Sequence, residues 1–153
     1  MPKVIISDTS CLIILTNIGE LDLLHRLYKT VIITQDILLE YGDNLPDWIE
    51  VRQVKDQYRQ QLLEMQIDKG EASAIALALE TGDNIVILDD WKARKVAERL
   101  GISVTGTLGV IIKAKNTGII PSIKPFLDEI RETNFRISEE LEQIALKEAN
   151  EKL

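Results

Sequence analysis

Five acidic residues fall near the ends of predicted strands and helices, where their side chains could do chemistry together: Asp8, Glu40, Glu71, Asp89 and Asp90. The first of them, Asp8, interrupts the apolar stretch KVIISDTSCLIIL at residues 3–15. A charge in such a stretch is costly unless something compensates it. The position of Asp8 therefore raises the question of what neutralises it.

Several carboxylates gathered in one pocket would repel one another. At about 5 Å and an effective dielectric constant of about 20, each pair costs roughly 3 kcal/mol. Protons or a cation must offset this cost, and a set of oxygen ligands favours a hard divalent ion such as Mg²⁺ or Mn²⁺. Such an ion polarises a phosphate and lowers the pKa of a bound water, so an acidic metal site suits phosphodiester hydrolysis.

The elements that must position these acids alternate along the chain. Short apolar runs predict strands at residues 4–6, 31–33, 49–54, 85–88 and 102–104. Helical spacing predicts helices at 10–17, 20–28, 34–40, 56–65, 71–81, 91–100, 105–115, 122–132 and 138–149, with Lys69-Gly70 breaking the chain before the fifth. This alternation predicts an α/β fold with a central parallel sheet of four to five strands, flanked by helices on both faces.

Ligands of a parallel sheet bind beyond the carboxyl ends of its strands. Asp8 directly follows the first predicted strand, and Asp89 and Asp90 directly follow the strand at 85–88. If these strands are neighbours, the acids can meet at one edge, within reach of Glu40 and Glu71. Plain structural roles stay open as well, since Asp8 and either residue of the Asp89-Asp90 pair can cap a helix and Glu71 suits a helix N-terminus.

Length and composition set further bounds. The chain of 153 residues is expected to form a single domain over 1–153, with the last two helices, about 122–150, as a C-terminal extension packed on it. Its net charge of −7 argues against a broad basic face that grips nucleic acid. With only Cys11 and His25 of their kinds, the chain can form no internal disulfide and is a poor candidate for a zinc site. Without a signal peptide or a long apolar run, a cytoplasmic protein that does not enter a membrane is expected.

The acids and their flanking segments resemble the PIN-domain ribonucleases, in particular the toxin-like branch of prokaryotic toxin–antitoxin pairs. The resemblance covers about residues 3–120 and rests on an ordered set of segments: Asp8-Thr9-Ser10, Val31–Glu40, Lys69–Ala78, Ile87–Ala97, Thr105–Val110 and Lys113–Lys115. Two positions depart from the family pattern. Glu71 stands where many members have Asp, and Leu88 stands where the family often has Thr.

This resemblance implies a PIN-like fold and a metal-dependent endonuclease that cuts single-stranded RNA. The acids that would hold Mg²⁺ or Mn²⁺, directly or through water, are Asp8, Glu40, Glu71 and Asp90. The departure at Leu88 leaves Asp89 as a candidate to share or replace the role of Asp90. Ser10, with Thr9 beside it, would donate hydrogen bonds around these ligands.

The same resemblance implies the partners. The RNA substrate would be contacted by Lys92, Arg94 and Lys95, which follow the acid pair. A small antitoxin protein would inhibit the enzyme, and the chain would form a homodimer. A solvated helix face is the alternative interpretation of the three basic residues.

Other functions fit the residues less well. A receiver-like domain needs an acid pair after the first strand, and an Asp-x-Asp phosphatase needs a second Asp where this chain has Ser10. The segment Gly106–Gly109 matches neither nucleotide-binding glycine fingerprint. One alternative stays open, a catalytically inactive PIN-like binding module that acts through a protein partner.

Overall fold

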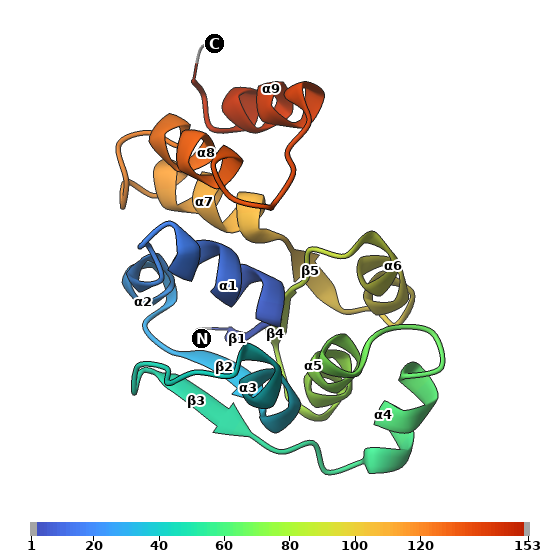
Figure 1. The fold of residues 1–153 in the computed structure, drawn as a ribbon. Coiled ribbons are helices and arrows are strands. Elements are labelled where there is room, and N and C mark those ends of the chain that lie inside the picture. Colours follow the sequence, from blue (N-terminus) through green and yellow to red (C-terminus); the bar gives the residue numbers. More distant parts are fainter. Residues whose placement is uncertain (1–2, 152–153) are drawn as a thin grey trace.

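The central feature of the structure is one sheet of five parallel strands. A computed structural model describes residues 3–151, so the expected domain limits at residues 1 and 153 lie outside the described residues. The strands are β1 (Val4–Ser7), β2 (Val31–Thr34), β3 (Ile49–Arg52), β4 (Asn84–Ile87) and β5 (Ser103–Thr105), in the order β3-β2-β1-β4-β5. The predicted α/β class and parallel sheet are confirmed (Figure 1).

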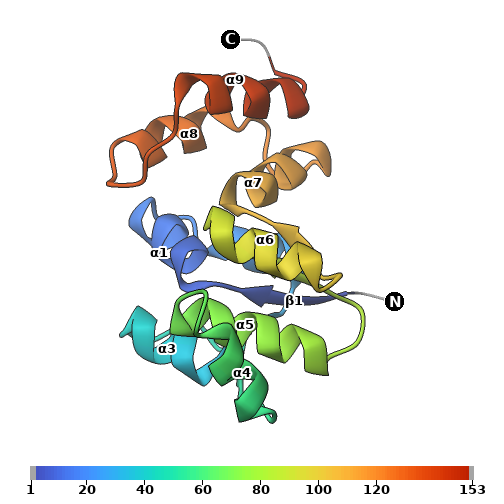
Figure 2. The same ribbon diagram turned by 90° about the vertical axis from the view of Figure 1, so that its right-hand side faces the viewer.

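Helices cover both faces of the sheet. They are α1 (Thr9–Asn17), α2 (Asp22–Tyr28), α3 (Gln35–Tyr41), α4 (Gln57–Leu63), α5 (Lys69–Glu80), α6 (Trp91–Arg99), α7 (Thr107–Asn116), α8 (Lys124–Arg131) and α9 (Glu139–Glu148). In Figure 2, α3, α4 and α5 lie on one side of β1, while α1 and α7 lie on the other with α8 and α9 outside them. Two-sided cover explains why β1 and β2 are nearly continuous apolar runs with buried side chains.

The prediction that Lys69-Gly70 breaks the chain is wrong. Helix α5 begins at Lys69, after Asp68 in the N-cap position, and Gly70 lies inside its first turn. The residue is small for a packing reason. A Cβ at this position would lie 2.8 Å from Oε1 of Glu40, so Gly70 allows α3 and α5 to approach closely.

The strand order decides which acids meet. Because β1 lies between β2 and β4, with Ile6 opposite both Ile32 and Val86, the loops after these strands share one edge of the sheet. The backbone N–H of Asp8 donates to the carbonyl of Ile87 over 3.0 Å, which extends the β1–β4 pairing to the first acid.

The last two helices pack outside α7. Side chains of α8 and α9, among them Leu127, Ile130 and Leu146, are buried in the core. Glu151 holds the two ends of this layer together, since its carboxylate accepts from the Ser122 hydroxyl and the Ile123 N–H, each at 2.7 Å. Within residues 3–151, no helix is both long enough and apolar enough to span a membrane.

Candidate active site

A pocket of about 540 Å³ lies at the carboxyl edge of the sheet. Four acids line it: Asp8, Glu40, Asp68 and Glu71. The start of α1 adds Thr9 and Ser10, and the segment 133–135 after α8 forms a further wall. The loop after β1, the helices α3 and α5 and the C-terminal layer therefore build this acidic pocket together.

Asp8 is the most enclosed of these acids, with only 3% of its surface exposed. It caps α1, accepting the Cys11 N–H at Oδ1 over 2.9 Å, while Oδ2 accepts the Asp89 N–H over 3.0 Å. Burial is the main reason that its pKa rises to about 8, and the charge of Asp89 and, less strongly, that of Glu71 raise it further. The hydrogen bonds from the Cys11 and Asp89 N–H groups lower the pKa and offset part of this rise. A cation bound beside this carboxyl would stabilise its charged form and lower its pKa.

Glu71 is a second acid whose pKa is raised by burial and by neighbouring negative charges. It lies half-buried in the first turn of α5, and its pKa rises to about 7. Burial is the largest cause, followed by the charges of Asp90 and Asp68 and a smaller contribution from Glu40. Among residues 3–151, none of the ion pairs includes Asp8, Glu40 or Glu71.

Glu40 lies on the opposite wall, near the end of α3. Its Oε1 accepts a hydrogen bond from the Thr9 hydroxyl, which fixes the carboxylate beside the start of α1. Gly70 of α5 leaves the room that this carboxylate occupies. Thr9 thus orients an acid in the structure, while Ser10 lines the pocket without a hydrogen bond to any of the acids among the described residues.

Asp89 and Asp90 point in different directions. Asp89 accepts the N–H of Thr107 at 2.8 Å and its hydroxyl at 2.6 Å, so its carboxylate anchors the start of α7. It lines a neighbouring pocket of about 420 Å³. Asp90 caps α6 by accepting the Ala93 N–H at 3.0 Å, and its charge helps to raise the pKa of Glu71.

The donor chemistry of the acidic pocket fits a hard divalent ion, because every candidate ligand is a carboxylate and two of them have raised pKa values. The carboxylates of the pocket do not, however, lie close enough together to surround one ion. Across residues 3–151, no three His, Cys, Asp or Glu side chains lie close enough together to hold a metal ion. Rotation of exposed Glu40 and half-buried Glu71 would be needed to gather the ligands.

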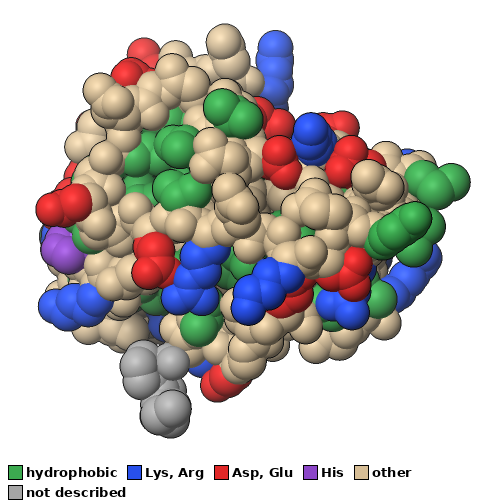
Figure 3. Space-filling model, turned by 90° about the horizontal axis from the view of Figure 1, so that it is seen from below, with side chains coloured by type: hydrophobic (Ala, Val, Ile, Leu, Met, Phe, Trp, Pro, Cys, Tyr) green, Lys and Arg blue, Asp and Glu red, His purple; other side chains and the backbone are tan. Residues whose placement is uncertain are grey.

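The three basic residues expected to contact RNA, Lys92, Arg94 and Lys95 of α6, have different surroundings. Lys92 is exposed, and Lys95 places its Nζ 5.4 Å from the ring centroid of Trp91, itself 72% exposed. Arg94 turns inward, where Nη1 donates to the Leu88 carbonyl at 3.3 Å. On the face seen in Figure 3, basic and acidic side chains are interspersed, without a continuous basic surface.

The sequence interpretation missed two parts of the pocket. Asp68 lies three residues before Glu71, and that spacing at a helix start could have marked it as a wall residue. The segment 133–135 follows α8 and reaches the pocket only through tertiary packing, so no local pattern identifies it.

A parallel α/β sheet with acids gathered at its carboxyl edge defines a class of fold that can bind a metal and a phosphate. The family model of the PIN domain matches residues 4–151, and the chain belongs to this family. PIN domains are generally nucleases that use divalent metal ions, so the chain belongs to a family of nucleases. Searches of curated proteins and of solved structures returned no significant match.

Proposed function

We propose that the protein is a Mg²⁺- or Mn²⁺-dependent endonuclease that cuts single-stranded RNA, and that it acts as the toxin of a toxin–antitoxin pair. The observation in its favour is the charge imbalance of the acidic pocket. Asp8 and Glu71 have raised pKa values, and no basic side chain among the described residues pairs with either. A divalent ion would relieve this repulsion.

The ion would be held by Asp8, Glu71 and Asp90. When bound, it supplies a Lewis acid for the phosphate and a water of lowered pKa. Glu40, which lines the pocket and is oriented by the Thr9 hydroxyl, would accept a proton from that water or, after rotating, complete the ligand set. Asp89 is proposed as a positioning residue, because its carboxylate holds Thr107 while its N–H fixes Asp8.

The RNA strand would lie over the rim of the pocket. Ser10 can donate its hydroxyl to a phosphate oxygen, and Lys92 and Lys95 can attract the backbone from α6. Trp91, next to Lys95, offers an exposed aromatic side chain of the kind on which bases of single strands stack. The inward turn of Arg94 favours a structural role for that residue.

The test is cleavage of labelled single-stranded RNA in Mg²⁺, Mn²⁺ or EDTA. We expect the wild type to cut only with metal and Asp8→Asn to lose at least about a hundredfold in rate, since removing a charge-stabilising group commonly costs that much. Asp83→Asn is the matched control, because Asp83 lies exposed next to the amino end of β4. Loss of cleavage in Asp8→Asn, together with unchanged cleavage in Asp83→Asn, would show that cleavage depends on the acidic pocket.

Metal binding can be measured without activity. A ligand that binds the folded state raises the melting temperature by mass action. We expect Mn²⁺ to raise it in the wild type and in Asp83→Asn, and not in Asp8→Asn. Equal shifts in all three proteins would argue against a metal site at Asp8.

The partners that we propose are a small antitoxin protein and a second copy of the chain. In support, Tyr58, Leu62 and Met65 form an exposed apolar face on and just after α4, with exposed fractions of 82%, 64% and 82%. Expression of the wild type in bacteria is expected to stop growth, whereas Asp8→Asn should not. Light scattering measures the oligomeric state.

A second candidate function is a PIN-like module that binds a partner without chemistry. The absence, among the described residues, of three acids within ligand distance favours it. This candidate predicts folded wild-type protein that cuts no RNA in any metal and shows no metal-induced rise in melting temperature.

A further inference from the structure

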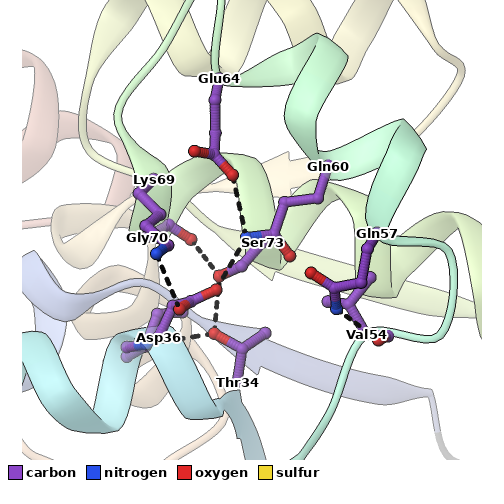
Figure 4. Close-up of polar contacts among 10 residues, drawn as sticks. Thr34, Asp36, Val54, Gln57, Gln60, Glu64, Lys69, Gly70 and Ser73 are labelled. Carbon is purple, nitrogen blue, oxygen red and sulfur yellow. Dashed lines mark hydrogen bonds and ion pairs between the residues drawn. The ribbon is translucent and has the colours of Figure 1, made fainter.

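A smaller pocket of about 200 Å³ lies between α3 and α4, apart from the acidic pocket. Thr34, the last residue of β2, and Gln53, just after β3, both line it. It therefore lies at the same carboxyl edge of the sheet as the acidic pocket. In the strand order, β2 is separated from β4, which precedes Asp89 and Asp90, by β1 alone. Figure 4 shows the polar side chains around it.

Gln60 is the unusual residue of this pocket, because it is polar and only 2% exposed. Its Nε2 donates to Oδ2 of Asp36 at 2.7 Å and to Oε2 of Glu64 at 3.2 Å. Its Oε1 is the only buried side-chain nitrogen or oxygen in residues 3–151 without a hydrogen-bond partner. Leaving a buried acceptor unpaired costs free energy, which a ligand that donates an N–H or O–H would recover.

The orientation of this amide is fixed by its neighbours. A flipped amide would turn its oxygen against two carboxylates, so the nitrogen must face Asp36 and Glu64. Gln57 has its nitrogen engaged as well, donating to the Val54 carbonyl at 2.7 Å. In Figure 4 the amide oxygens of Gln60 and Gln57 point toward the same space, so the α4 side of the pocket presents acceptors, while the exposed side chains of Gln35 and Gln53 also line the pocket.

The remaining hydroxyls nearby are already used. Ser73 donates to the Gly70 carbonyl at 2.6 Å, so in its 2.6 Å contact with Thr34 it must accept. Thr34 in turn accepts the Ile37 N–H at 3.1 Å. Asp36 faces the ammonium of Lys69 at 3.8 Å, which offsets its charge. The pocket therefore suits a neutral ligand that donates hydrogen bonds, rather than a phosphate.

Helix α3 connects this pocket to the acidic pocket. Asp36 lines the first and Glu40 lines the second, four residues and about 6 Å apart along the helix axis. A strand with a phosphate in the acidic pocket could therefore place a nearby base in the smaller one. The space of about 200 Å³ is roughly seven times the volume of one water in the liquid, about 30 Å³, which is enough for a planar base and too small for a whole nucleotide chain.

We infer that the pocket between α3 and α4 binds one base of the single-stranded RNA and prefers a base with an exocyclic amino group. Gln60 accepts from that amino group, and Gln57 supplies a second acceptor at the rim. This inference rests on the proposed function in that the ligand is RNA. It adds a site that reads the base, apart from the acids that act on the phosphate.

The test compares short fluorescent oligonucleotides of cytosine only and of uracil only, whose bases differ in an amino group or a carbonyl at one ring position. Affinity is measured in EDTA, so that no strand is cut. We expect the wild type to bind the cytosine strand about tenfold more tightly, which is the size of a good base contact. Gln60→Met should bring the ratio to about one.

Two further variants keep the result interpretable. Gln61→Met is the matched control, because Gln61 is exposed on the same helix and does not line the pocket. It should keep the tenfold ratio. Gln57→Met removes the rim acceptor from an exposed position, and it should lower the ratio even if Gln60→Met fails to fold.

The outcomes separate this inference from the proposed function. Equal wild-type affinity for the two strands, or a ratio unchanged in both pocket variants, overturns the base pocket, as expected if the pocket holds only water or a side chain of a partner. A base preference without metal-dependent cleavage keeps the pocket and rejects the nuclease. Metal-dependent cleavage without a base preference supports the nuclease and rejects the base pocket. Failure to bind any RNA overturns both.

Discussion

Asp8 is the residue whose environment has the clearest energetic consequence. Its pKa rises from 3.8 to about 8 in the folded protein, mainly through burial and the charge of Asp89. The folded state then binds the proton more tightly than the unfolded state. The free energy of unfolding therefore falls as the pH rises from about 4 to about 8, and it levels off above that range.

Asp8→Asn should remove much of this pH dependence. In EDTA at about pH 8, we expect the variant to unfold at a higher urea concentration than the wild type, because it buries no charge. One of the two N–H contacts is lost, since an amide has a single acceptor oxygen, and this partly offsets the gain. Identical slopes of stability against pH in both proteins would contradict the assigned cause.

Substitution of Gly70 tests the close packing of α3 against α5. Ala should suit this helix better by up to about 1 kcal/mol, and the nearest atom to its Cβ is the movable end of Glu40. Gly70→Ala is therefore expected to keep or raise the melting temperature while cleavage falls, because the Glu40 carboxylate must leave its place. Gly82→Ala, with open space around the added Cβ, should leave cleavage unchanged.

At the scale of elements, α6 combines two roles. Its first turn is fixed by Asp90, while its exposed face offers Lys92 and Lys95. The resemblance predicts one common role for the three basic residues, yet only these two face outward. A role in RNA binding is consequently proposed for them and not for Arg94.

The salt dependence of RNA binding measures this role. A lysine that contacts a phosphate of a single strand contributes about 0.7 to the slope of log affinity against log salt. We expect Lys92→Ala and Lys95→Ala each to reduce the slope by that amount and to weaken binding to all sequences similarly. Lys3→Ala, at the opposite edge of the sheet, should leave the slope as it is.

At the scale of the whole molecule, the C-terminal layer completes the acidic pocket through residues 133–135. Glu151 holds that layer. Partial burial opposes its charge, but the hydrogen bonds from Ser122 and Ile123 and the nearby Lys115 outweigh this and lower the pKa of Glu151. The contribution to stability is present near neutral pH and is lost as the pH falls through the folded-state pKa.

Glu151→Gln should therefore loosen α8 and α9 at neutral pH. Hydrogen exchange is expected to become faster over residues 124–148 and to stay slow in β1, and RNA cleavage should fall because one wall of the pocket moves. Glu148→Gln is the control, since its side chain is exposed. Exchange in Glu151→Gln that is as much faster in β1 as in α8 and α9 would show that Glu151 acts on the whole fold rather than on this layer.

The sequence by itself determined the local features of this protein. Apolar runs and helix caps indicated the strands and helices, because these depend on neighbouring residues, and they indicated that Asp8, Asp89 and Asp90 follow strand ends. The family segments carried the assignment to PIN domains, which the match over residues 4–151 supports.

Only the tertiary structure decided how the acids are shared between pockets. Strand order brought the Asp89 N–H to Asp8, and packing of α7 turned the Asp89 carboxylate toward Thr107. Likewise, the unpaired oxygen of Gln60 arises from a polar side chain enclosed between two helices. Such contacts join residues far apart in the chain, and their geometry depends on how layers pack rather than on any local pattern.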